Sequence, residues 1–172
     1  MTTITVKVSR SMNVTAERVW DVIADYPNVH LYHPLVANVD LRSSTERGVG
    51  ASRVCNFYDN TSVAEEVTDW QEGKSFTVEL SEFSLPVKSA TATMKVEATG
   101  ANRSEASIAM ELTPKFGALV GWLMGTVVMR PLMRKTFKQV LAGLEHHAAT
   151  GELVGKDWKA PKSAPSLPAP AN

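Results

Sequence analysis

The sequence predicts an α+β domain in which a curved antiparallel sheet of about seven strands packs against a long C-terminal helix. Three observations predict this class. Apolar and polar residues alternate over a first segment, six further segments with strand character are separated by short turn sequences, and an apolar helical pattern follows them. A curved sheet that meets a long helix across its concave face tends to enclose a space, so we expect a protein that holds a small apolar molecule.

The first three elements follow from local patterns near the N-terminus. Isoleucine and valine alternate with polar residues over residues 3–12, which predicts a half-buried strand. Thr15 then has the side chain of an N-cap, and the helix that it starts should end near Asp25. Pro27 suits the first turn of a second short helix, which should run to about His33. Two small helices are therefore expected after the first strand.

Six strands are predicted between Leu35 and Leu112, because turn-forming residues interrupt this segment repeatedly. These turns lie at residues 48–50, 59–61, 72–74, 84–86 and 100–102. On the last two strands apolar residues, among them Met94 and Met110, occupy alternate positions. The short connections predict an antiparallel meander with one apolar face and one solvated face.

The last element is a helix that follows Pro114. Apolar positions from Leu119 to Leu144 keep a helical period and include Trp122, Val127, Met133 and Phe137. We expect Pro131 to kink this helix and Gly151 to mark its end. The longest uncharged run, residues 116–129, is shorter than the roughly 20 apolar residues that a transmembrane helix needs, so no membrane span is predicted.

Length and composition favour one globular domain with a tail. The chain has 172 residues, of which 44% are hydrophobic, and we place the domain at residues 1–152. Residues 153–172 are rich in proline and alanine and are expected to form a flexible tail. Eighteen basic residues balance eighteen acidic ones, so no global field is expected to attract nucleic acid or an anionic membrane surface, and no nucleic-acid partner is predicted.

The single cysteine and the first residues indicate the cellular compartment in which the protein is expected. Cys55 has no second cysteine with which to form a disulfide, and the first residues lack the basic and apolar regions of a secretory signal. A cytoplasmic protein, either a monomer or a homodimer, is the expectation.

The order of elements, together with residues along its length, resembles the START-like or Bet v 1-like superfamily, also called SRPBCC, and within it the polyketide cyclase/dehydrase-type proteins. The residues that carry the likeness are the segment 16–23 (AERVWDVI), His33-Pro34, Gly48, Gly50, Arg53, Glu65, Pro86, Pro114 and Gly143-Leu144. The resemblance covers about residues 3–151. It implies a helix-grip fold with a cavity between sheet and helix. Members carry hydrophobic ligands, sense plant hormones, cyclise polyketides or have no assigned activity, so the fold alone does not settle the function.

Two neighbouring strands carry a candidate polar site. The first set of residues on one side is Arg53, Cys55 and Phe57, and the second is Val63, Glu65 and Val67. A three-residue loop at residues 59–61 would place Cys55 opposite Glu65 and both sets on one face. A two-residue loop would bring Val54 and Asn56 to that face instead. We favour the three-residue loop, because it turns the apolar members inward.

Glu65 and His33 are the candidate catalytic residues. In an apolar wall Glu65 could act as a general base, anchor a ligand or form a structural ion pair with Arg53, and the ion pair is the interpretation we favour. His33 could donate to a ligand carbonyl or shuttle a proton. A metal site of His30 and His33 with Cys55 or Glu65 lacks a third ligand at recognisable spacing, so neither metal nor cofactor is predicted. Cys55 is best explained as a small buried hydrophobe.

The leading hypothesis is a domain that binds a hydrophobic or aromatic small molecule. The candidate ligand-binding residues are Tyr32, His33, Arg53, Cys55, Phe57, Glu65, Val67, Phe76, Val78, Met94, Met110, Phe116, Trp122 and Met133. One alternative is a polyketide cyclase or dehydratase that uses Glu65 or His33 for proton transfer. Another is a partner-binding or chaperone-like module that docks through residues 116–129 and holds no small ligand.

Overall fold

The computed structural model of the chain describes residues 3–83, 87–115 and 124–161. Seven strands form one antiparallel sheet in the order β1-β7-β6-β5-β4-β3-β2. The strands are β1 (Ile4–Met12), β2 (Val36–Leu41), β3 (Ser52–Phe57), β4 (Ser62–Gln71), β5 (Ser75–Ser81), β6 (Val87–Gly100) and β7 (Arg103–Pro114). The helices are α1 (Ala16–Ala24), the 3₁₀ helix η1 (Tyr26–Leu31), the π-helical η2 (Met124–Met129) and α3 (Arg130–Thr150).

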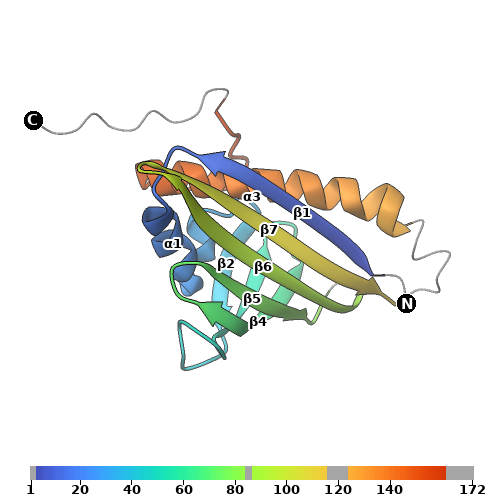
Figure 1. Cartoon of the computed structure of the whole chain (residues 1–172). Helices are drawn as coiled ribbons and strands as arrows, with labels where there is room; N and C mark the ends of the chain where they lie inside the picture. The colour runs from blue at the N-terminus through green and yellow to red at the C-terminus, as the bar shows by residue number, and fades with distance from the viewer. Residues whose placement is uncertain (1–2, 84–86, 116–123, 162–172) are drawn as a thin grey trace, which may run out of the picture.

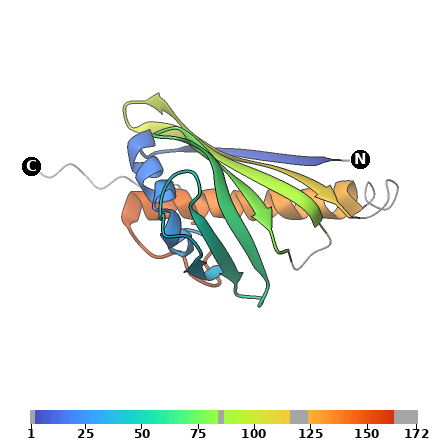
Figure 2. The ribbon, with the colours of Figure 1, turned by 90° about the horizontal axis from the view of Figure 1, so that it is seen from below.

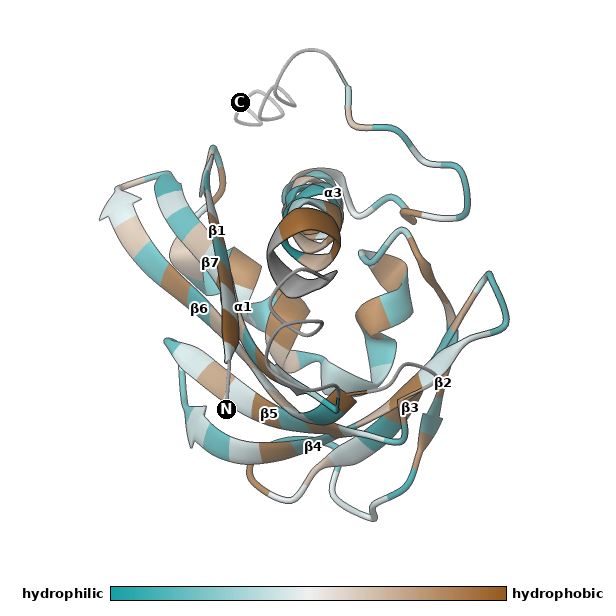
Figure 3. Cartoon of the chain, turned by 90° about the vertical axis from the view of Figure 1, so that its right-hand side faces the viewer, coloured by the Kyte–Doolittle hydropathy of each residue, from teal (hydrophilic) through white to brown (hydrophobic). Residues whose placement is uncertain are grey.

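The sheet curves around the C-terminal helix. Figure 1 shows α3 beside β1 and β7, and Figure 2 shows it running along the length of the long strands. In the view along the helix, β1, β7 and β6 rise on one side, β5 and β4 lie beneath, and β3 and β2 close the other side (Figure 3). The predicted α+β class, with a curved sheet against a long C-terminal helix, is confirmed.

The N-terminal elements follow the sequence closely. β1 starts one residue after the predicted position, and the backbone N–H of Arg18 donates to Thr15 Oγ1 over 3.2 Å at the start of α1. The second short helix is a 3₁₀ helix that ends at Leu31, two residues before the predicted end at His33. It consists of two short 3₁₀ turns that meet at a kink at Asn28, and the chain then extends into β2.

The β3–β4 hairpin has the predicted loop length at a different place. The N–H of Phe57 donates to the carbonyl of Thr61 over 2.9 Å, so the three loop residues are 58–60 rather than 59–61. Asn60 takes the left-handed conformation, with φ of 66°, at the third loop position, where asparagine is well tolerated. Asp59 closes the turn by accepting from the backbone N–H and the hydroxyl of Thr61.

This one-residue shift corrects the predicted strand register. Arg53, and not Cys55, lies opposite Glu65, while Cys55 pairs with Val63. A one-residue move of the loop centre changes the pairing by two residues, which preserves the face on which each side chain lies. The prediction that the inward-facing residues of β3 and β4 share a face is therefore right. The prediction that Cys55 lies opposite Glu65 is wrong.

The C-terminal helix also departs from the prediction. Pro131 is the second residue of α3, so the predicted proline lies where the π-helical η2 changes to the α-helix. The π-helical η2 precedes it. Val127, expected on the apolar stripe, is 62% exposed because η2 does not continue the periodicity of α3. The predicted end is confirmed, since Gly151 caps α3 with φ of 75°.

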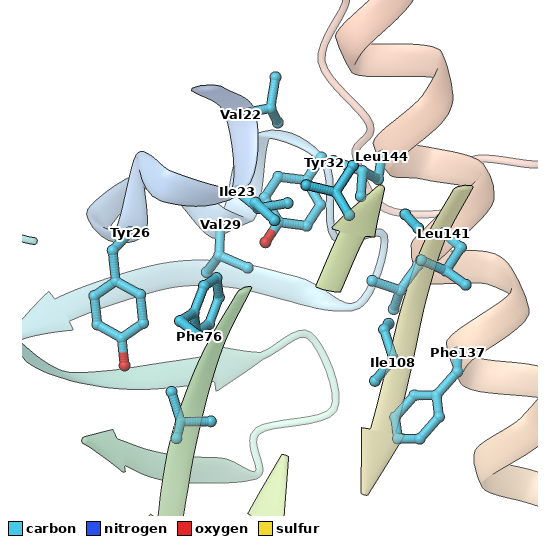
Figure 4. Packing of buried hydrophobic residues seen from close by; sticks show 14 of the residues in the cluster. Val22, Ile23, Tyr26, Val29, Tyr32, Phe76, Ile108, Phe137, Leu141 and Leu144 are labelled. Carbon is cyan, nitrogen blue, oxygen red and sulfur yellow. The ribbon is translucent and has the colours of Figure 1, made fainter. Parts of the chain in front are cut away.

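The core lies between the concave face of the sheet and the helices. In Figure 4, Ile23 of α1 and Val29 of η1 lie on one side of Tyr32, and Leu141 and Leu144 of α3 lie on the other. All five side chains are buried. This packing joins the two short helices to the C-terminal half of α3.

The chain remains packed beyond residue 152, at which we placed the domain boundary. Val154 is fully buried, and its N–H donates to the carbonyl of Leu31 over 2.9 Å. It packs near Gly143, where the backbone of α3 approaches Tyr32 so closely that a Cβ would overlap the Tyr32 carbonyl oxygen. In the parts of the chain that the structure describes, no helix combines the length and apolar character needed to cross a membrane.

Candidate functional site

A buried ion pair lies at the inner face of β3 and β4. Arg53 Nη2 is 2.6 Å and Nε is 2.9 Å from the same oxygen of Glu65, Oε2. Arg53 is only 5% exposed, and the Glu65 side chain is 15% exposed. The two residues are direct partners across the strands, so the backbone register holds their side chains together. The ion pair expected from the sequence therefore forms.

Tyr26, which the sequence analysis did not name, completes the support of this pair. Its ring lies 3.8 Å from the Arg53 guanidinium carbon, and its carbonyl accepts from Arg53 Nη1. Its hydroxyl donates to the carbonyl of Glu65 over 3.3 Å. Burial acts to lower the pKa of Arg53, but the Glu65 carboxylate outweighs it and raises that pKa overall, so Arg53 stays charged.

Tyr32 is a second buried tyrosine, within electrostatic range of Arg53 and Glu65. The residue is 2% exposed, and no side chain or backbone group among the described residues forms a hydrogen bond with its hydroxyl. Figure 4 shows the hydroxyl directed into the interior, away from Leu144. Burial, more than any neighbouring charge, raises the pKa of this hydroxyl and keeps it protonated. Polar groups inside proteins normally have a hydrogen-bond partner, and this hydroxyl has none among the described residues. It can therefore bond a ligand or a water molecule.

His33 is held as a neutral hydrogen-bond donor. Its Nδ1 accepts from the backbone N–H of Leu35 over 3.2 Å, which leaves the proton on Nε2. Burial, followed by the positive charge of Arg53, lowers the pKa of His33 to about 3. The ring also lies against Phe57, with 6.1 Å between centroids. At neutral pH this histidine has the features of a hydrogen-bond donor more than those of a proton shuttle.

Cys55 has the properties of a buried hydrophobe. Burial, and then the negative charge of Glu65, raise the pKa of its thiol to about 12, and the opposing influence of Arg53 is smaller. A thiol that stays protonated at neutral pH is a poor nucleophile. The chemistry available at this site is therefore hydrogen bonding and charge stabilisation by Arg53, Glu65, Tyr32 and His33.

The remaining candidate residues form an apolar wall. Val67, Phe76 and Val78 are buried in the core, whereas Phe57, Met94, Met110 and Met133 are only partly buried. On the sheet, Met94 lies opposite Phe76 and Ile108, and Met110 lies opposite Ala92 and Val6. Phe116 and Trp122, together with Leu119 of the predicted helix, lie outside the described residues.

The structure brings some candidates together and leaves others apart. Tyr32, Cys55 and the Arg53–Glu65 pair form one electrostatically connected cluster, with His33 near Arg53. His30 does not join it by any hydrogen bond or ring contact found among the described residues. Within those residues, no three histidine, cysteine, aspartate or glutamate side chains gather closely enough to hold a metal ion.

Tyr26 could have been found from the helix pattern. It follows Val19, Val22 and Ile23 at helical spacing, which places it on the apolar face of the first helix. Nothing local in the sequence indicates that its carbonyl and ring would hold Arg53, because that contact depends on how η1 packs over β3.

The comparisons with known proteins agree with this architecture. Residues 3–149 match the family described as "Polyketide cyclase / dehydrase and lipid transport". No curated protein matches the chain. Among solved structures, the chain is similar to the Zhui aromatase/cyclase from a Streptomyces species, at 14% identity and a TM-score of 0.67, with 87% of this chain and 98% of that chain covered.

Two further solved structures extend the likeness of fold. A START superfamily protein from Mycobacterium smegmatis has 10% identity and a TM-score of 0.68, with 84% of this chain and 97% of that chain covered. The protein XoxI from Bacillus cereus has 16% identity and a TM-score of 0.70, with 86% and 96% covered. The match over most of its length shows that this chain belongs to the polyketide cyclase/dehydrase and lipid transport family.

Proposed function

We propose that this protein binds an uncharged hydrophobic or aromatic small molecule between the concave face of the sheet and α3. The observation that carries the proposal is the hydroxyl of the buried Tyr32 side chain, which lies within electrostatic range of the Arg53–Glu65 pair and is bonded to no described group. The hydroxyl oxygen keeps some solvent access, since it is not one of the fully buried side-chain atoms without a partner among the described residues, and it can therefore reach water or a ligand. A ligand with one polar group would satisfy it.

The apolar wall supports binding of a nonpolar body. Ala92, Met94 and Met110 are on the inward side of their strands, yet they remain partly accessible in the middle of the sheet. Apolar side chains that stay accessible on a concave face gain free energy when a ligand covers them, at about 25 cal/mol for each Å² removed from water. Thioether side chains also adapt to ligands of different shape.

The charge balance of the polar cluster favours an uncharged ligand. Glu65 already compensates Arg53, and both are largely removed from water. A ligand carboxylate would add a buried charge with no remaining counterion in this cluster, which is strongly unfavourable. A ligand hydroxyl or carbonyl meets no such penalty, and it could bond the Tyr32 hydroxyl, Oε1 of Glu65 or the Nε2–H of His33.

The family supports this proposal in outline. Its description includes both lipid transport and polyketide chemistry, and one solved structure of similar fold is an aromatase/cyclase. Lipids and polyketides share an extended apolar body with a few oxygen atoms. This is the kind of molecule that a half-accessible apolar wall with one polar cluster would suit.

A cyclase or dehydratase is a second candidate, favoured by the geometry of Glu65. Both Arg53 hydrogen bonds reach Oε2, and the Cys55 thiol, a weak donor, is a further side-chain partner of Glu65. Oε1, which Arg53 does not engage, could accept a proton from a bound substrate. If so, Glu65→Gln would abolish turnover of a polyketide-like substrate while Kd changed little. Equal turnover in the variant would remove Glu65 from the mechanism.

Native mass spectrometry of freshly purified protein, joined with organic extraction, tests the proposed function. We expect a stoichiometric uncharged lipid or aromatic compound that leaves the protein on extraction. Co-purification of a free fatty acid would contradict the charge argument. An empty protein that also fails to take up the uncharged probe N-phenyl-1-naphthylamine would contradict binding itself.

A further inference from the structure

A basic and apolar surface lies at the start of the C-terminal helix. Val127, Val128 and Leu132 are 62%, 47% and 56% exposed, which is unusual for large apolar side chains. The basic residues beside them in sequence are Arg130, Arg134, Lys135 and Lys138, the last three of them exposed. We call these seven residues the basic–apolar patch.

The charge of this surface differs from that of the whole chain. Residues 124–144 contain four basic residues and no aspartate or glutamate. The remaining residues therefore carry 14 of the 18 basic side chains against all 18 acidic ones, which makes them net negative. Among the described residues, no ion pair or hydrogen bond joins the patch's basic side chains to an acidic partner. The neutral total thus hides a local positive field.

The patch faces away from the core. Leu132 and Lys135 are three residues apart in α3, which places them near one helix face, and Val127 and Val128 are exposed at the end of η2 just before it. The opposite face of α3 is buried through residues such as Phe137 and Leu141. Figure 1 places this start of α3 at the end of the molecule where β1 begins, far from α1. The patch is therefore available to a large, flat partner.

We propose that the basic–apolar patch docks the protein on the surface of a membrane that contains anionic phospholipid. A helix with exposed apolar side chains next to lysine and arginine binds an interface by inserting the former among acyl chains and placing the latter near phosphates. The exposed apolar side chains of the patch match the acyl chains, and its basic side chains match the lipid phosphates. A docked helix start would bring the end of the sheet close to the bilayer, without any span across it.

This inference goes beyond the proposed ligand binding and does not depend on it. Vesicle binding is measured on the protein alone, with no molecule added to its interior. Loss of ligand binding in Tyr32→Phe would leave docking intact, and loss of docking would leave binding of a soluble probe intact. The two proposals can therefore fail separately.

Flotation with lipid vesicles tests the docking. The full chain is mixed either with phosphatidylcholine vesicles or with vesicles of phosphatidylcholine and phosphatidylglycerol in equal amounts. We expect flotation with the anionic vesicles only, and a decrease as salt is raised. Arg134→Glu/Lys135→Glu should weaken the partitioning at least about tenfold, since each basic side chain near an anionic surface contributes a roughly fivefold factor.

Two further variants separate docking by the patch from a general effect of net charge. Lys74→Glu/Arg103→Glu makes the same change in charge at exposed sites elsewhere and should float as the wild type does. Val127→Ser/Leu132→Ser should weaken partitioning, because it removes the inserted apolar groups and keeps every charge. All these positions are exposed, so melting temperatures should be unchanged. No flotation with anionic vesicles, or equal losses in the patch and the control charge variants, would overturn the proposal.

Discussion

Arg53 and Glu65 face each other across β3 and β4, and both guanidinium nitrogens that reach the carboxylate donate to one oxygen, Oε2. The pair is thus held by the strand register, by two hydrogen bonds and by the ring of Tyr26 beneath the guanidinium. It fixes two charges inside an apolar wall, and Arg53 does not engage the second carboxylate oxygen. Structural support and ligand recognition can therefore be tested separately.

Removal of one member of the pair should destabilise the fold. Arg53→Met leaves the Glu65 carboxylate without its counterion, and we expect the free energy of unfolding to fall by about 3–5 kcal/mol. The double variant Arg53→Met/Glu65→Leu should recover much of this loss, because no unpaired charge remains. Urea denaturation of the single and double variants measures both values, and simple additivity of the two single losses would contradict the pairing.

Loss of the Tyr32 hydroxyl should affect ligand binding and not stability. Tyr32→Phe removes a group that has no partner among the described residues, so the unfolding free energy should stay equal or rise, while affinity for a hydroxyl-bearing ligand falls. Tyr26→Phe is the matched control. It removes the hydroxyl that donates to Glu65, and we expect a loss of about 1 kcal/mol in stability. Calorimetric titration and denaturation measure the two effects, and the reverse pattern would contradict these assignments.

α3 approaches the segment after η1 so closely at Gly143 that we expect no side chain to fit at this position. In Gly143→Ala the new Cβ would overlap the Tyr32 carbonyl oxygen, a backbone atom, so we expect a loss of about 2–3 kcal/mol. Gly155→Ala is the control, because an added Cβ there meets no atom within 4 Å. Thermal denaturation of the two variants should differ clearly. A wild-type melting temperature for Gly143→Ala would show that the two segments can separate at little cost.

His33 should make stability depend on pH in the acid range. Its pKa is about 3 in the folded protein, mainly through burial, and about 6.5 in an unfolded chain. Between these values the unfolded state binds one more proton, so the unfolding free energy should fall as the pH falls from 6.5 toward 3, by up to about 1.4 kcal/mol for each pH unit. His33→Asn keeps an acceptor for Leu35 and should flatten this decline. Parallel stability profiles of variant and wild type, or an NMR titration midpoint for His33 above pH 5, would contradict the assignment.

The fold could be predicted because its determinants are local and repeated. Thr15, Gly151 and the alternating strands each reveal an element within a few residues of sequence. The register of β3 and β4 was less accessible, since it depends on whether Asn60 or Thr61 ends the loop. Both choices place Arg53 and Glu65 on the inner face, and for that reason the ion pair was predicted although the cross-strand register was not.

Long-range contacts account for what the sequence did not reveal. Glu145 of α3 is buried and accepts from Arg10 Nε over 2.7 Å and from the N–H of Asn13. More than 130 residues separate these partners. An acidic residue near two histidines at a helix end otherwise resembles a solvated group. Tyr26 escaped notice for the same reason, because its contact with Arg53 exists only after η1 packs on the sheet.

A fluorescence titration with N-phenyl-1-naphthylamine, an uncharged aromatic probe, tests the central claim most directly. It compares the wild type with Met110→Asp on the concave face and with Ala109→Asp, which points to the opposite face beside Lys7. The account predicts saturable binding at one site in the wild type and in Ala109→Asp, and at least tenfold weaker binding in a folded Met110→Asp protein. Equal affinity in all three proteins, or no saturable binding in the wild type, would contradict a ligand site between the sheet and α3.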